Sequence, residues 1–155
     1  MNVKPAVGIR MKHRAPLPRS YFSRLRIALD AATIHGDRIV SYLGQLESPE
    51  MVAEAADLLL RAEEIRWTMA LGLIDGWLHV SLRTIDRDRH AGRIARNLAG
   101  KRGFGGGHQA LAAAQIPVNG ATNRDKKVLS MVRGLTRRFL RATGTPDEPG
   151  QKLCS

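Results

Sequence analysis

The segment 67–84, WTMALGLIDGWLHVSLRT, decides the fold. It holds two strand-like runs, 67–74 and 77–84, joined by Asp75-Gly76, a dipeptide typical of a two-residue β-hairpin turn. Alternate residues of the second run are apolar and form a face for the core: Leu78, Val80 and Leu82. The other face of that run carries Trp77, His79, Ser81 and Arg83. The sequence therefore predicts an antiparallel hairpin with one apolar face turned inward.

Helical patterns surround this hairpin. Apolar residues recur at helical spacing in four stretches: 19–32, 51–62, 91–98 and 123–143. Ser48 is expected to cap the second of these helices, with Pro49 at its first position. Short apolar runs at 39–43 and 110–118 are strand-like. We expect an α/β protein with a mixed β-sheet of about four to five strands, including one hairpin, flanked by helices.

Composition fits one globular domain. The chain has 155 residues, of which 43% are hydrophobic and 25% charged. The single cysteine, Cys154, excludes a disulfide framework and favours a reducing compartment. No apolar run approaches the roughly 20 residues of a membrane helix, and the N-terminus lacks a signal-peptide pattern. We therefore expect a cytoplasmic protein without a membrane partner.

The net charge of +11 is unevenly distributed along the chain. Residues 41–82 carry a net −5, whereas 1–40, 83–108 and 109–155 carry +6, +5 and +5. Segregated positive charge attracts polyanions such as nucleic acid or nucleotides. It is also compatible with a charged surface that only keeps the protein soluble.

The most unusual stretch is 100–108, GKRGFGGGH, with four glycines between positions 103 and 107. Consecutive glycines allow backbone N–H groups to point into one concavity and bind phosphate oxygens. His108 follows the glycines, where a helix could begin, and could donate a hydrogen bond to the same anion. The alternative is a flexible surface loop without a ligand.

GGGH followed by Ala112-Ala113-Ala114 resembles the GGGHxxAAG signature of the DHH-associated domain. That domain is the C-terminal, substrate-binding half of the DHH phosphoesterases. The segments that agree with it in order are 56–67, 78–84, 90–108 and 132–144, so the resemblance spans 22–144. One departure is Ala114, which stands where the signature has glycine.

The resemblance implies a two-lobed enzyme whose N-terminal lobe holds two divalent metals, usually manganese, that activate water. Family activities include degradation of short oligoribonucleotides, hydrolysis of a nucleotide bisphosphate, single-strand exonucleolysis and cyclic-dinucleotide hydrolysis. This chain has no DHH motif, so it is expected to be inactive alone and to bind no metal or other cofactor. We expect 1–35 to be the connector and helix from the missing lobe, 36–144 the substrate-binding domain and 145–155 a flexible tail.

The resemblance also implies the site residues. By position in the motif, Gly105, Gly106, Gly107 and His108 would contact substrate phosphate. Arg83 matches the arginine of the SLR strand end in the family and would reach the substrate. Lys101 and Arg102 are weaker assignments, because the family varies there.

Other candidates have plainer interpretations. Asp86, Asp88 and His90 could form part of a metal site, but arginines interrupt them and Asp88 could instead cap the following helix. His79 is more typical of a partly buried sheet residue than of a catalytic base. Four arginines of the last helix form either a solvated face or a track for a nucleic-acid backbone: Arg133, Arg137, Arg138 and Arg141.

Three functions remain open from the sequence. The first is a phosphate-binding module for nucleotides or short single-stranded RNA or DNA, acting with a DHH lobe in cis or in trans. The second is part of a full-length metal-dependent phosphoesterase. The third is a non-specific basic RNA-binding module. A homodimer is a further arrangement that the sequence allows.

Overall fold

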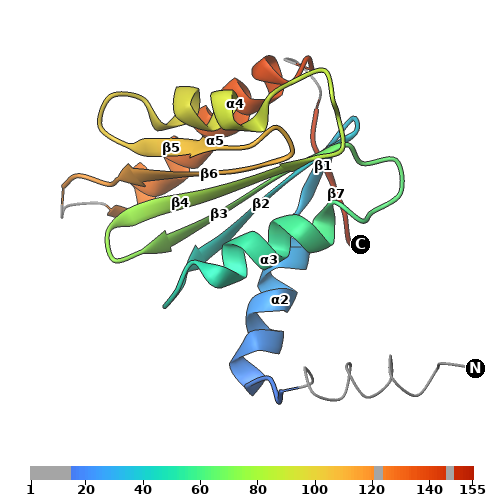
Figure 1. Ribbon diagram of the computed structural model, residues 1–155. Coiled ribbons are helices and arrows are strands. Elements are labelled where there is room, and N and C mark those ends of the chain that lie inside the picture. Colours follow the sequence, from blue (N-terminus) through green and yellow to red (C-terminus); the bar gives the residue numbers. More distant parts are fainter. Residues whose placement is uncertain (1–14, 121–123, 146–148) are drawn as a thin grey trace, which may run out of the picture.

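The computed structural model describes residues 15–120, 124–145 and 149–155, and it confirms an α/β fold with a mixed sheet (Figure 1). The helices are α2 (Arg19–Ala31), α3 (Glu50–Leu59), α4 (Ala91–Ala99) and α5 (Arg124–Ala142). The strands are β1 (Thr33–His35), β2 (Arg38–Gln45), β3 (Trp67–Ile74), β4 (Trp77–Thr84), β5 (Phe104–Gly107), β6 (Leu111–Pro117) and β7 (Gln151–Lys152).

The sheet has seven strands in the order β5-β6-β4-β3-β2-β1-β7, rather than four to five. The additional strands are the short ones, β1, β5 and β7, which lie near or at its edges. Among the described strands, only β2 and β3 pair in parallel. The hairpin of β3 and β4 is confirmed, and both turn residues have positive φ, 51° at Asp75 and 79° at Gly76, as its tight turn requires.

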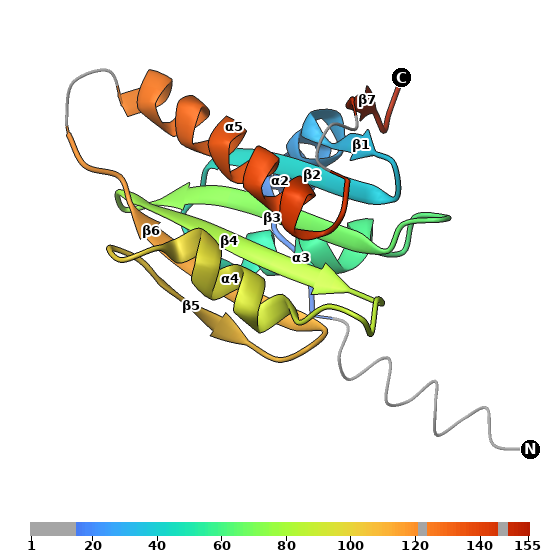
Figure 2. The same cartoon turned by 90° about the horizontal axis from the view of Figure 1, so that it is seen from above.

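Helices cover both faces of the sheet (Figure 2). Helices α4 and α5 pack on one face, where Trp67 of β3 meets Phe139 of α5 edge-on with ring centroids 6.0 Å apart. Helices α2 and α3 pack on the opposite face. Because helices cover both faces at the centre of the sheet, all eight residues of β3 are buried.

Two expected helix caps are wrong. Helix α3 begins at Glu50, and its cap position is Pro49, which has no side-chain acceptor for the free N–H groups. The Ser48 hydroxyl instead hydrogen-bonds the Glu50 carboxylate and lowers the pKa of Glu50. Helix α4 is capped by His90 rather than Asp88, because the Arg93 N–H donates to His90 Nδ1 over 3.2 Å.

Candidate functional site

The sheet face that carries Arg83 is covered over only part of its width. Helix α3 packs across β3 and β4, so Ser81 and Arg83 are only 7% and 8% exposed. Beyond β4, this side of the sheet is exposed, and Leu111 of β6 is 48% accessible. We call these positions of β5 and β6 the open sheet face: Phe104, Gly106, Leu111, Ala113 and Gln115.

The glycine-rich stretch is an edge strand, and the expected concave loop is wrong. Residues 104–107 form β5, which pairs with β6 as the outermost strand. A Cβ on Gly105 would lie 2.5 Å from the backbone oxygen of Ala95 in α4. On Gly107 it would lie 2.5 Å from the backbone oxygen of Leu111. These glycines are therefore required by close packing of α4 and of the β5–β6 turn.

Gly106 differs from its neighbours, because a Cβ there would have no atom within 4 Å. Its missing side chain leaves bare backbone on the open sheet face. Since β5 is an edge strand, alternate N–H groups also point away from β6 without a strand partner. The stretch thus keeps donors that could meet a phosphate, although not in the arrangement expected from sequence.

His108 lies at the tip of the β5–β6 hairpin. Its N–H donates to the Leu111 oxygen over 2.7 Å, and its oxygen accepts from the Gly92 N–H over 2.9 Å. The backbone is thus fixed on both sides while the imidazole is exposed. No helix follows His108, because the chain turns directly into β6.

Arg83 lies beside this hairpin and is held by three acceptors. Its Nε donates to Asp57 Oδ1 of α3 over 2.6 Å. Its Nη1 donates to the Leu82 oxygen over 2.9 Å and to the Ala112 oxygen over 3.5 Å. Ala112 pairs with Gly107 in the next strand, so the guanidinium lies near the glycines. A tenth of the side chain remains exposed for a ligand.

Lys101 and Arg102 do not join this group. They lie in the turn between α4 and β5, at the opposite end of β5 from His108. Four residues of extended strand separate these ends, which corresponds to about 13 Å. Both are exposed and face a different pocket, between α4 and α5.

Sequence reasoning missed two features of this region. The first is Asp57, whose pairing with Arg83 depends on how α3 crosses the sheet. The second is Phe104, which is 67% exposed and lies against Trp77 with ring centroids 6.0 Å apart. An aromatic residue inside a run of glycines has few apolar neighbours along the chain to pack against. That pattern could have indicated that Phe104 is exposed.

His79 lies half-buried on β4 beside a pocket of about 260 Å³ between α3 and the open sheet face. Burial lowers its pKa below the ordinary 6.5, and the opposing effect of Asp75 is smaller. This position fits the partly buried sheet residue expected from sequence.

Acidification is expected to destabilise the protein partly through His79. A histidine with a depressed folded pKa binds its proton more readily in the unfolded chain. Its contribution to stability is therefore complete well above pH 6.5 and is lost as the pH falls through 6.5 toward the folded pKa. Urea unfolding at about pH 7.5 and 5.5 should show a smaller loss for His79→Gln than for the unsubstituted protein. An equal loss in both would contradict this assignment.

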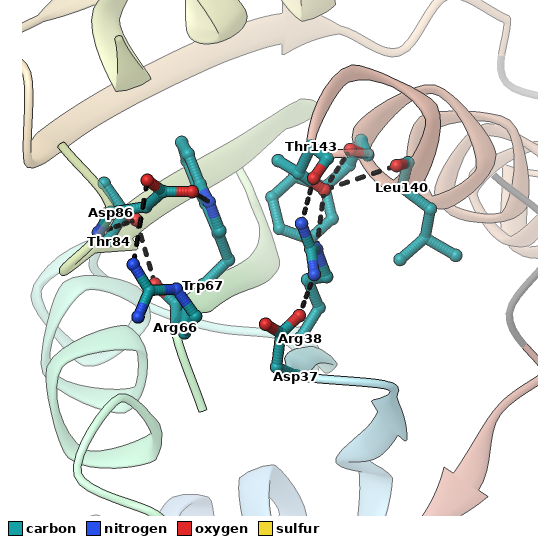
Figure 3. A network of polar contacts seen from close by, with 9 residues as sticks. Asp37, Arg38, Arg66, Trp67, Thr84, Asp86, Leu140 and Thr143 are labelled. Atoms are coloured by element: carbon teal, nitrogen blue, oxygen red, sulfur yellow. Dashed lines mark hydrogen bonds and ion pairs between the residues drawn. The ribbon is translucent and has the colours of Figure 1, made fainter. Parts of the chain in front are cut away.

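Asp86 belongs to a structural network where β3 begins and β4 ends, away from the Asp75-Gly76 turn (Figure 3). Its Oδ2 accepts from Trp67 Nε1 over 3.4 Å, and its Oδ1 accepts from the Asp88 N–H over 3.0 Å and lies 3.8 Å from Arg66 Nη2. These bonds lower the pKa of Asp86, with the Asp88 N–H as the largest cause. Across residues 15–120, 124–145 and 149–155, no three His, Cys, Asp or Glu side chains gather as a metal site.

Comparison with known proteins agrees with the fold and motif. The DHHA1 domain family matches residues 36–135, and the chain belongs to that family. The resemblance inferred from GGGH and its flanking segments is thus confirmed. No helix among the described residues is long and apolar enough to cross a membrane.

The relatives place the domain within longer proteins. An uncharacterized protein of Methanocaldococcus jannaschii is 32% identical over 93 residues, which cover 60% of this chain and 19% of that protein. The chain thus spans about a fifth of the curated relative it matches. An exopolyphosphatase-related protein from Bacteroides fragilis has a similar fold, with a TM-score of 0.55 and 16% identity. The alignment covers 87% of this chain and 40% of the Bacteroides protein. A DHH domain from a member of the s1p family of ribosomal proteins aligns with a TM-score of 0.50, 12% identity, and 80% and 31% coverage.

Proposed function

We propose that this domain is the substrate-binding part of a DHH-family phosphoesterase and holds phosphate groups of a nucleotide or short single-stranded nucleic acid at the β5–β6 hairpin. One observation carries the proposal: Arg83, His108 and the bare strand backbone at Gly106 lie together beside the open sheet face. Three kinds of hydrogen-bond donor, one of them always charged, suit an oxyanion.

Each donor has a distinct task in this proposal. The edge N–H groups of β5 bind phosphate oxygens where no side chain stands in the way. Arg83 supplies fixed positive charge, because its other donors are anchored by Asp57 and by strand carbonyls. His108, exposed at the hairpin tip, closes over the outer side of the anion.

In this proposal hydrolysis takes place outside this domain. The family resemblance implies two divalent metals, usually manganese, that activate water, and no three His, Cys, Asp or Glu side chains gather as a metal site among the described residues. We place those metals in a DHH lobe, joined in cis or supplied in trans. This domain then binds and orients the substrate, and the lobe carries out the chemistry.

A polarisation titration of a 5′-labelled short RNA at two salt concentrations tests the proposal. His108→Ala and Arg83→Met should each weaken binding about tenfold or more at both salts, since a charge-assisted hydrogen bond contributes about 1.5–3 kcal/mol. Arg137→Gln, an exposed charge on α5, is the control and should change binding less than twofold.

The alternative of non-specific RNA binding is favoured by four exposed arginines on α5: Arg133, Arg137, Arg138 and Arg141. In that case binding would weaken steeply as the salt concentration rises. It would be unchanged by His108→Ala and by Arg83→Met. The Arg137→Gln control would then weaken binding more than either hairpin substitution.

Asp57→Asn is expected to tighten phosphate binding about threefold or more, because the carboxylate competes with the ligand for Arg83. The loss of stability should stay below about 1 kcal/mol, since Asp57 is 62% exposed. Glu63→Gln is the matched control, because it removes the same charge from an exposed site. Equal gains in both variants would mean that net charge alone determines affinity.

A further inference from the structure

Helices α4 and α5 cover the sheet face opposite to the open sheet face (Figure 2). They border a second pocket. It has a volume of about 460 Å³ and is formed by the end of α4, the following turn, the end of β6 and the middle of α5. That volume is within the roughly 300–1,000 Å³ typical of small-ligand sites. None of the hairpin residues 105–108 lines it.

The floor of this pocket is aliphatic. Leu98 and Leu135 lie at its base and are 4% and 5% exposed, and Ile116 and Met131 are partly buried beside them. Among the lining residues that the structure describes, Asn119 is the one with an uncharged hydrogen-bonding side chain. A nucleobase would lose water there and gain few hydrogen-bond partners, whereas an alkyl chain loses nothing polar.

Gly134 keeps the wall of the pocket open. It lies on α5 in the lining, and a Cβ built on it would meet no atom within 4 Å. Glycine inside a helix is destabilising relative to alanine, so a larger residue would favour the helix. A leucine at this position would therefore project into free space without disturbing the backbone.

Four cations surround the opening: Lys101, Arg102, Lys127 and Arg138. No acidic residue is among the described residues of the lining. Arg138 donates to the Asn97 carbonyl oxygen and Lys127 to the Asn119 carbonyl oxygen, which directs both side chains along the rim. The ion pairs within the described ranges engage Arg38, Arg66 and Arg83 instead, so the four rim charges have no carboxylate partner there.

From this arrangement we propose that the pocket binds a small amphipathic anion, an aliphatic chain that carries a phosphate head. The chain fills the apolar floor and the dianionic head lies among the four cations. A polynucleotide backbone would match the cations but leave the floor unfilled, which favours the amphiphile. The site is separate from the hairpin and does not depend on the function proposed for it.

Titration calorimetry with monomeric octyl phosphate tests this proposal on the full chain. Octyl phosphate should bind at least about tenfold more tightly than inorganic phosphate, which lacks the alkyl chain, or octanol, which lacks the phosphate. Gly134→Leu should weaken binding about tenfold or more by filling the pocket. The double variant Lys101→Gln, Arg102→Gln should weaken it to a similar degree, and Arg137→Gln, outside the lining, less than twofold.

Far-UV circular dichroism first establishes that Gly134→Leu keeps its helix content, and Gly134→Ala serves as a second, smaller filling of the same wall. Octyl phosphate binding that survives Gly134→Leu in the folded protein would overturn the proposal. Equal affinity for octyl phosphate and inorganic phosphate would do the same. Binding lost through His108→Ala would place the amphiphile at the hairpin, which overturns this inference and leaves the proposed function intact.

Discussion

Gly105→Val is expected to lower the free energy of unfolding by about 3 kcal/mol or more, because it forces a side chain against helix backbone. A Cβ at this position would stand 2.5 Å from the Ala95 oxygen, and backbone cannot yield as a flexible side chain does. Relief requires α4 to move away from β5, and Ala95 and Ala99 would then lose burial. Urea unfolding followed by circular dichroism measures the change.

Gly106→Val is the matched control, one residue away on the same strand. No atom lies within 4 Å of its Cβ, and valine favours extended backbone, so stability should change by less than about 1 kcal/mol. Under the proposed function the same valine covers bare backbone and weakens phosphate binding about tenfold or more. Equal destabilisation by both valines would contradict the packing described for β5.

Trp67→Ala is expected to cost about 3–5 kcal/mol of stability, the usual range for a large aromatic removed from a core. Trp67 is fully buried, joins β3 to α5 through Phe139, and donates to Asp86. Its loss leaves a cavity between sheet and helix and an unmatched Asp86 acceptor. Since domains have about 5–15 kcal/mol of stability in total, the loss should be plain in thermal or urea unfolding.

Trp77→Ala supplies the comparison, because Trp77 is half-buried at the edge of the open sheet face and contacts the exposed Phe104. We expect a cost of less than about 2 kcal/mol, since much of its surface is already in water. A larger loss from Trp77→Ala than from Trp67→Ala would contradict the assignment of the core.

The centre of the fold is predictable from the sequence because local signals agree there. The hairpin of β3 and β4 follows from alternation and from Asp75-Gly76, and the structure has its strands at 67–74 and 77–84. Helices α2, α4 and α5 follow from apolar spacing. In each case the residues that determine the element lie within it.

The edges of the sheet were not predictable in the same way. Strand β5 consists largely of glycine, which has low strand propensity, and it forms because α4 and β6 hold it in place. Strand β7 has two residues and pairs with β1 across the length of the chain, whereas the three-residue β1 also pairs with the neighbouring β2. Contacts distant in sequence leave no local signal.

The candidate site shows the same distinction between what local sequence predicts and what depends on packing. The family motif indicated Arg83 and residues 105–108. In the structure Arg83 of β4 contacts Ala112 of β6, which pairs with Gly107 of the β5–β6 hairpin. Lys101 and Arg102 closely precede residues 105–108 in the sequence but line the pocket of α4 and α5, because the two ends of strand β5 lie apart. The burial of Arg83 by Asp57 depends on helix packing and could not be read from either segment.

Backbone amide shifts in ¹⁵N-labelled protein, titrated with a 5′-phosphorylated trinucleotide, test whether phosphate binds at the β5–β6 hairpin. We expect the largest perturbations at residues 105–108 and at Arg83, retained at higher salt, with Gly134 and Met131 little changed. Perturbations spread along the arginines of α5, fading with salt and sparing the hairpin, would contradict it.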